Sequence, residues 1–130
     1  GCNATSKDGK LFEVCGQSGI SWTAANQNCT GAGYDGLASL LNSSEQATVE
    51  PLMSGHSWIG LNDINTEGSF EWADGESFDG SFAPWSSGQP DDTDGGPDSA
   101  DCVALNPVST WQDATCDTTV MNGYICSWTP

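Results

Sequence analysis

Hydrophobic residues in the first part of the chain recur at the spacing of an α-helix. Trp22, Ala25 and Cys29 lie three and four residues apart, and Ser21 directly before them is a favourable N-cap. Two glycines, at positions 31 and 33, end the pattern. The spacing therefore predicts a helix that begins after Ser21 and buries Cys29.

Two further short segments follow this helix. The apolar run from Leu37 to Leu41 is typical of a short strand. Ser43 and Ser44 are placed to cap a second helix, which Pro51 should end or bend. The first half of the chain is thus expected to supply two helices.

From residue 58 onward the hydrophobic residues form short aromatic or branched runs separated by turn-rich connections, a pattern typical of antiparallel strands. The runs are Trp58 to Leu61, Ser69 to Trp72, Cys102 to Leu105 and Tyr124 to Cys126. Between about 74 and 101 there is little periodicity and much Gly, Ser, Pro and Asp, so one long loop is expected, and such loops are usually functional or disordered. These elements together predict an α+β fold.

The length of 130 residues suits a single domain, 1–130, with one core. Residues 1 to 19 have the pattern of an N-terminal hairpin around Lys10 to Val14, stapled by Cys2 and Cys15. No window contains the roughly 18 unbroken apolar residues that a membrane span requires, so membrane insertion is not expected. The N-terminus also lacks an apolar signal-type segment, which indicates a mature form or an excised piece.

Six cysteines form an even set in a small acidic chain, which favours three disulfides made in an oxidising compartment. A zinc site is excluded because no CxxC pair occurs and His56 is the only histidine. Three N-glycosylation sequons, which begin at Asn3, Asn28 and Asn42, give weak further support for secretion. The expected location is extracellular.

The charge of the chain is strongly one-sided. Eighteen Asp and Glu face only Lys7 and Lys10, and the formal net charge is -16. The segment from Gln89 to Asp101, QPDDTDGGPDSAD, contains five aspartates and no cation. Clustered carboxylates destabilise a compact state, and Ca²⁺ with oxygen ligands is the usual remedy outside the cell. The same charge argues against nucleic acid and anionic membranes as partners.

Several fragments, in this order along the chain, resemble the C-type lectin domain family. They are Trp22-x-x-Ala25-x-x-x-Cys29, Leu37-Ala-Ser-Leu40, Trp58-Ile-Gly-Leu61, Glu67-Gly-Ser-Phe-Glu-Trp72, Gln89-Pro-Asp91, Asp101-Cys102-Val, Trp111-Gln-Asp113, Cys116 and Tyr124-Ile-Cys126. The resemblance covers essentially the whole chain. It implies the C-type lectin fold, with two helices packed on antiparallel sheets, a long calcium-binding loop region and three disulfides.

The resemblance also implies which cysteines pair. It joins Cys29 to Cys126 and Cys102 to Cys116, with Cys2 to Cys15 as the extra bridge of the family's longer form. The bridge from Cys29 to Cys126 is expected to tie the first helix to the last strand.

For the principal calcium site the resemblance implies Gln89, Asp91, Gln112 and Asp113, together with an acid before Cys102. Pro90 between the first two is expected to be cis, which turns both side chains the same way. Amide and carboxylate oxygens are suitable ligands for an ion that accepts six to eight of them.

For a second calcium, common in the family, the resemblance implies Asp63, Glu67, Asp92 and Asp101. Asp63 and Glu67 lie four residues apart before the turn at Gly68, and neither has a cation nearby in the sequence. The alternative is a merely hydrophilic connection between strands. The expected cofactor is therefore Ca²⁺, as one or two ions.

The order Gln-Pro-Asp resembles that of galactose-type members, whereas Glu-Pro-Asn marks mannose-type ones. The resemblance thus implies a glycan with terminal galactose or N-acetylgalactosamine as the partner, held by the calcium ligands Gln89, Asp91, Gln112 and Asp113. The sequence leaves open whether the chain forms oligomers.

Three positions depart from the family pattern. Ala100 stands where a Glu ligand is usual, and Asp98 or Asp94 could replace it. Gln112 stands where Asn is usual, and Thr93 where galactose binders often carry an aromatic residue. All three departures fall in the expected sugar and calcium site, and the expected fold does not depend on them.

Two functions of different class therefore stay open. The first is a calcium-dependent carbohydrate-binding module for extracellular recognition or adhesion. The second is a C-type-lectin-like domain that binds protein, mineral or ice surfaces without sugar, for which the excess of Asp is attractive. An enzyme is not expected, because no nucleophilic triad or isolated carboxylate pair can be recognised. Most of the tryptophans are expected to be core or loop anchors.

Overall fold

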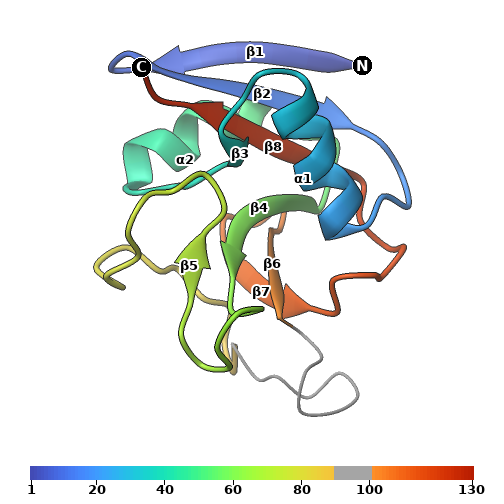
Figure 1. The fold of residues 1–130 in the computed structure, drawn as a ribbon, viewed down its shortest axis with the longest axis vertical. Coiled ribbons are helices and arrows are strands. Elements are labelled where there is room, and N and C mark those ends of the chain that lie inside the picture. Colours follow the sequence, from blue (N-terminus) through green and yellow to red (C-terminus); the bar gives the residue numbers. More distant parts are fainter. Residues whose placement is uncertain (90–100) are drawn as a thin grey trace.

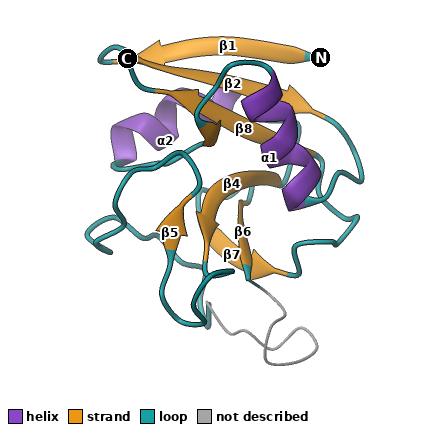
Figure 2. Ribbon diagram, in the orientation of Figure 1, coloured by secondary structure: helices purple, strands orange, loops and turns teal. Residues whose placement is uncertain are grey.

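The structure is a computed structural model, and it describes residues 1–89 and 101–130. Figures 1 and 2 show two helices and a sheet whose strands come from both ends of the chain. In chain order the elements are β1 (Cys2–Lys7), β2 (Lys10–Gly16), α1 (Trp22–Gly31), β3 (Gly36–Leu37), α2 (Ser43–Val49), the 3₁₀ turn η1 (Glu50–Leu52), β4 (Ser57–Asn62), β5 (Glu71–Trp72), β6 (Cys102–Leu105), β7 (Trp111–Ala114) and β8 (Gly123–Trp128).

The strands form one sheet in the order β1-β2-β8-β4-β6-β7, with β3 paired to β8 and β5 to β4. All pairs are antiparallel except β4 with β8, which run parallel at Ser57 and Trp58. The expected fold class is confirmed, with this one parallel pair in an otherwise antiparallel sheet. A parallel pair needs a long crossover connection, and the chain between β4 and β8 contains the long loop and the β6–β7 hairpin.

The first helix lies where the pattern predicts it. The Ser21 side chain accepts a hydrogen bond from the backbone N–H of Ala24, and Trp22, Ala25 and Cys29 form the buried face. Ala32 is the C-cap, directly after Gly31. The indole of Trp22 donates to the carbonyl of Ile59 at 2.9 Å, so the start of this helix is fixed to β4.

Two expected boundaries in the next segment are wrong. The N-cap of α2 is Asn42, whose side chain accepts from Glu45 N–H, and not Ser43 or Ser44. The expected strand from Leu37 to Leu41 is reduced to β3, and a side chain at Gly60 would collide with the carbonyl of Leu37. Ala38 still donates its N–H to the carbonyl of Ile125 in β8, while its own carbonyl accepts from Gly60 N–H, so at this residue the chain passes from β8 to β4.

The core consists of two clusters separated by the sheet. One lies under α1 and contains Trp22, Trp58, Met121 and the cysteines of two disulfides. The other contains Phe12, Leu40, Ile59, Trp72 and Trp111 among its members. Four of the tryptophans are therefore buried anchors, as expected from the sequence.

The three expected disulfides are present: Cys2 to Cys15, Cys29 to Cys126 and Cys102 to Cys116. The bridge from Cys29 closes 97 residues and joins α1 to β8. In the closed-loop description a bridge of this span stabilises by about 4 to 5 kcal/mol. Neither of the two described helices has the length and apolarity needed to cross a membrane.

Candidate metal and ligand site

Asp63 and Asp101 are neighbours because β4 and β6 are antiparallel partners. The register runs from Ser57 opposite Leu105 to Asn62 opposite Cys102, with an irregularity between. The residue after β4 therefore meets the residue before β6, and Asp63 N–H donates to the carbonyl of Asp101 at 3.0 Å. Backbone pairing thus places two aspartates side by side at the end of the sheet away from β1 (Figure 1).

Glu67 joins them through a tight turn. The backbone N–H of Gly68 donates to Oδ2 of Asp63 at 2.8 Å. Gly68 has a φ of 83°, in the left-handed region that favours glycine. One carboxylate oxygen from each of Asp63, Glu67 and Asp101 lies within 4.8 Å of the others. We call these three residues the acid cluster.

Burial makes this cluster electrostatically costly. Asp63 is 4% exposed and Asp101 is 8% exposed, while Glu67 is exposed. Oδ1 of Asp63 is buried and has no hydrogen-bond partner within the described part of the chain. Buried carboxylate oxygens are normally satisfied by donors or by a metal ion. Carboxylate oxygens in this number and spacing suit a hard divalent cation.

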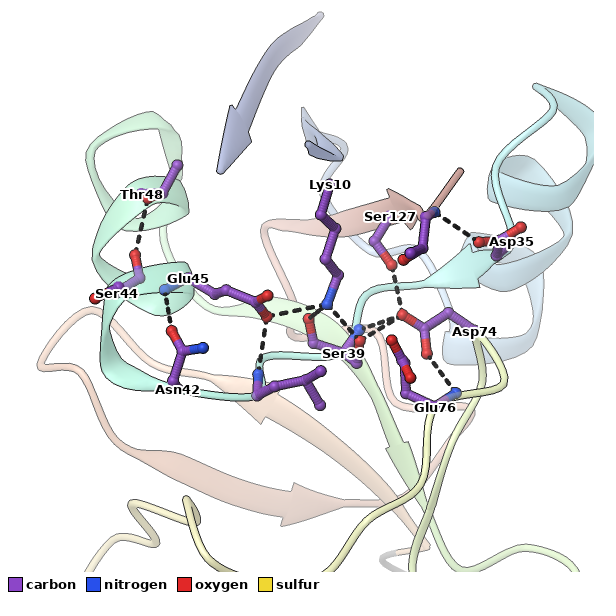
Figure 3. A network of polar contacts seen from close by, with 12 residues as sticks. Lys10, Asp35, Ser39, Asn42, Ser44, Glu45, Thr48, Asp74, Glu76 and Ser127 are labelled. Atoms are coloured by element: carbon purple, nitrogen blue, oxygen red, sulfur yellow. Dashed lines mark hydrogen bonds and ion pairs between the residues drawn. The ribbon is translucent and has the colours of Figure 1, made fainter. Parts of the chain in front are cut away.

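The two lysines do not neutralise these acids. Lys10 is buried, and its Nζ donates to Oε1 of Glu45 at 3.0 Å and to Oγ of Ser39 at 2.7 Å (Figure 3). Lys7 is at the end of β1, 3.9 Å from exposed Asp8. Because the chain has no other Lys or Arg, a cation for the acid cluster has to come from solution.

The carboxylate of Asp74 extends the hydrogen-bond network of Lys10, Ser39 and Glu45 toward the long loop. Its Oδ2 accepts hydrogen bonds from the backbone N–H and the hydroxyl of Ser39 and from the hydroxyl of Ser127 (Figure 3). Its Oδ1 accepts from Glu76 N–H at 3.2 Å. The chain directly after β5 is thereby tied to β8 and to the segment that follows β3.

Gln89 and Asp113 form a second contact between expected site residues, near the end of β7. The backbone N–H of Asp113 donates to Oε1 of Gln89 at 3.2 Å. Asp113 is 5% exposed, and Gln89 is half-buried. The structure therefore brings together two of the residues expected at the principal calcium site.

The segment before Gln89 is held along β7 by backbone hydrogen bonds and ring contacts. Trp111 N–H donates to the carbonyl of Pro84, and Ser86 N–H donates to the carbonyl of Trp111, each at 2.8 Å. The Trp111 ring makes edge contacts with Trp72, Phe82 and Trp85 at centroid distances of 5.6 to 5.7 Å. This packing determines where the chain reaches Gln89.

No described hydrogen bond joins Gln112 to the acid cluster or to the pair formed by Gln89 and Asp113. It lies opposite Ala104, while Asp113 lies opposite Val103. Consecutive strand residues point to opposite faces of a sheet, which places Gln112 on the other face from Asp113. Asp91, Asp92 and Asp98, with Pro90, Thr93, Asp94 and Ala100, lie outside the described residues.

Sequence reasoning missed four polar residues that hold together the elements around the long loop. Lys10 was expected only as one of two charges in a hairpin, and Glu45 and Asp74 were not singled out. Gln46, also unnoticed, accepts a hydrogen bond from the Trp111 indole at 2.8 Å. The position of Glu45, three residues after the Asn42 cap, is a capping signal that could have drawn attention to it.

A further group that satisfies a metal-ligand distance criterion contains Cys2, Glu13 and Cys15. Both sulfurs belong to the same disulfide, so they carry no thiolate for a metal.

The family model described as "Lectin C-type domain" matches residues 18–128. Among curated proteins, human C-type mannose receptor 2 is 33% identical over 119 residues, which cover 88% of this chain and 7% of that protein. Human C-type lectin domain family 10 member A is 33% identical over 102 residues, 76% of this chain and 31% of that protein. This chain therefore spans only a small part of the curated relatives it matches.

Solved structures of similar fold include C-type carbohydrate-recognition domains and antifreeze proteins. The carbohydrate-recognition domain of cow CD23, crystallised in the presence of a GlcNAc2Man3 oligosaccharide, superposes with a TM-score of 0.85 and 26% identity over 98% of this chain and 93% of that one. Herring type II antifreeze protein superposes with a TM-score of 0.80 and 26% identity over 98% and 96% of the two chains. The names of these relatives describe receptors, lectins and an antifreeze protein.

Proposed function

The chain belongs to the C-type lectin domain family, and on that premise we propose that it binds glycans with terminal galactose or N-acetylgalactosamine in a calcium-dependent manner. The observation that carries the calcium part is the buried, unpartnered Oδ1 of Asp63 within the acid cluster. The three disulfides support an extracellular location for recognition or adhesion.

Two groups of residues would hold the ions. Asp63, Glu67 and Asp101 fit one ion, with Asp92 proposed as a further ligand. Gln89 and Asp113, which meet through a hydrogen bond, are proposed with Asp91 and Asp98 for the principal ion. Gln112, which the resemblance also implied, lies on the other face of the sheet from Asp113 and is not proposed as a ligand of this ion. The residues present therefore fit Ca²⁺, as one or two ions, by the chemistry of their oxygens.

Calcium, when bound, supplies coordination positions that sugar hydroxyls can take in place of water. The protein's own residues would then orient the sugar. The amide of Gln89 offers N–H donors and a carboxylate such as Asp91 offers only acceptors, so hydroxyls are given a donor side and an acceptor side. This order of donor and acceptor supports the galactose-type assignment.

A glycan array tests the proposal directly. The protein is applied to immobilised glycans in millimolar calcium and again with a chelator. We expect retention on terminal galactosides in calcium and none with chelator, while mannosides retain none in either condition. Retention that survives the chelator would contradict the metal-dependent mechanism, and retention on mannosides alone would contradict the galactose assignment.

A second candidate function is binding to ice, protein or mineral surfaces without sugar. The superposition with herring type II antifreeze protein, at 26% identity, favours the ice version. If no glycan is retained in either condition and the protein slows the growth of seeded ice crystals, this second function replaces the first.

A further inference from the structure

Each of the three N-glycosylation sequons has a different structural setting. Asn3 lies on β1, Asn28 lies in α1, and Asn42 is the N-cap of α2. The three asparagines are all exposed as residues. What distinguishes them is the use that the fold makes of each side-chain amide nitrogen, the atom to which an oligosaccharide would be attached.

The fold already uses Nδ2 of Asn28. This nitrogen donates to the hydroxyl of Tyr124 at 3.4 Å, and Tyr124 is a buried residue of β8. The next residue, Cys29, is fully buried and bonded to Cys126. An oligosaccharide on Asn28 would start against β8 beside this disulfide, so it would conflict with the packing of α1.

Asn42 presents the opposite case. Its Oδ1 accepts the hydrogen bond from Glu45 N–H at 2.9 Å that caps α2 (Figure 3). Among the described residues none accepts a hydrogen bond from its Nδ2. Substitution of Nδ2 leaves Oδ1 in place, so the cap is compatible with an attached oligosaccharide.

Asn3 lies on the edge strand of the sheet. Its backbone pairs with Val14 of β2, and β1 is the first strand in the sheet order. Its side chain is exposed and makes no hydrogen bond to another described residue. No described residue therefore competes for its Nδ2.

We propose that Asn3 and Asn42 are N-glycosylation sites and that Asn28 is not. In the transfer, Nδ2 bonds to the anomeric carbon of a lipid-pyrophosphate-linked oligosaccharide. The bond from that carbon to the pyrophosphate oxygen breaks, the lipid pyrophosphate leaves, and Nδ2 gives up one proton and keeps the other. The proposal requires only passage through a secretory pathway that performs this transfer, and it does not depend on the sugar that the domain itself binds.

A glycan on Asn3 would have a physical consequence for the sheet. Exposed edge strands offer unpaired backbone groups to other chains, and proteins usually cover or charge them. β1 lies at the end of the molecule opposite the acid cluster (Figure 1). An oligosaccharide there shields the edge without covering the proposed binding site.

The test is site mapping on the full chain secreted from a eukaryotic host. Glycans are removed by an amidase in heavy-oxygen water, which converts each modified asparagine to labelled aspartate. Trypsin cuts at Lys7 and isolates Asn3, and a protease specific for acidic residues separates Asn28 from Asn42 at Asp35. We expect the label at positions 3 and 42 and none at 28.

Three matched variants, Thr5→Ala, Thr30→Ala and Ser44→Ala, remove one sequon each and keep every asparagine. The first and third should each lose one glycan in electrophoretic mobility, and Thr30→Ala should migrate like the parent chain. A labelled Asn28, or an unlabelled Asn3 or Asn42, would overturn the assignment of that site.

Discussion

Asp63 is the residue at which the fold treats two chemically equal atoms differently. Oδ2 accepts the Gly68 N–H and fixes the turn that delivers Glu67, whereas Oδ1 is buried without a described partner. One oxygen is therefore structural, and the other is the one we propose as a calcium ligand. This division allows the two roles to be separated by substitution.

The variant Asp63→Asn keeps an oxygen for Gly68 and removes one negative charge from the acid cluster. In chelator we expect its melting temperature to equal or exceed that of the parent, because repulsion with Glu67 and Asp101 falls. In calcium we expect it to be less stable than the parent, with calcium affinity at least about tenfold weaker, or about 1.4 kcal/mol. Calorimetric titration and thermal unfolding measure both effects.

Asp8→Asn is the matched control. Asp8 is exposed in the β1–β2 turn with a φ of 53°, a conformation that Asn tolerates. This variant has the same change of charge at the other end of the molecule, so its calcium affinity should equal that of the parent. If Asp63→Asn destabilises the protein equally with and without calcium, Asp63 is structural only.

For individual residues, part of the candidate site could be predicted from the sequence. The resemblance named Asp63, Glu67 and Asp101, and the structure places their oxygens together, although their role as ligands stays a prediction. It also named Gln112 beside Asp113, and strand alternation separates these two. Residue identity along a motif does not reveal which face of a strand each side chain occupies.

Among the elements, β2 and α2 are joined by the only buried ion pair of the described residues, Lys10 with Glu45. Oε1 of Glu45 also accepts the backbone N–H of Leu41 at 2.9 Å, which holds the segment between β3 and α2. Through Ser39 the pair contacts Asp74, at the start of the long loop. One cation thus organises four parts of the chain.

Lys10→Met should lower the free energy of unfolding by about 3 to 5 kcal/mol, because it leaves the Glu45 charge buried without its partner. Adding Glu45→Gln removes that charge and keeps the oxygen for Leu41, so the double variant should recover much of the loss. Urea unfolding with the disulfides intact measures all three proteins. A double variant no more stable than Lys10→Met would show that the loss comes from packing instead of charge.

Element boundaries could be predicted where a local signal decides them. Ser21 caps α1 through its own side chain, and the helix begins as the sequence indicates. The apolar run after Leu37 gave no such signal, and it is buried beside β4 without extending β3. Whether a short apolar run pairs as a strand depends on neighbours that are distant in the sequence.

For the whole molecule, the distribution of charge is more informative than its sum. The net charge is -16, and the one buried lysine lies in the half that contains β2 and α2. The buried aspartates at positions 63, 101 and 113 lie in the other half. The part of the folded molecule that contains these three aspartates is therefore the part expected to respond to divalent cations.

Calcium should raise the melting temperature markedly, because an ion that binds only the folded state stabilises it by mass action. At a free concentration one hundred times the dissociation constant, each site adds about 2.7 kcal/mol, which corresponds to about 10 °C for a domain of this size. Differential scanning calorimetry in calcium and in chelator measures the shift. Sodium chloride of equal ionic strength is the control, and an equal shift with sodium would show that screening alone is responsible.

The arrangement of the outermost strands has a mechanical consequence. β1 is hydrogen-bonded along its length to β2 and linked to it by Cys2 and Cys15, and β2 is hydrogen-bonded to β8 from Leu11–Trp128 to Gly16–Gly123. Tension applied between the two chain ends would pass from Cys2 across the disulfide to Cys15, so the β1–β2 ladder is bypassed. From there the covalent path runs along residues 15 to 29 and through the bridge from Cys29 to Cys126 in β8. The acid cluster lies outside that load path, so tension on the chain ends would leave the arrangement of its carboxylates unchanged.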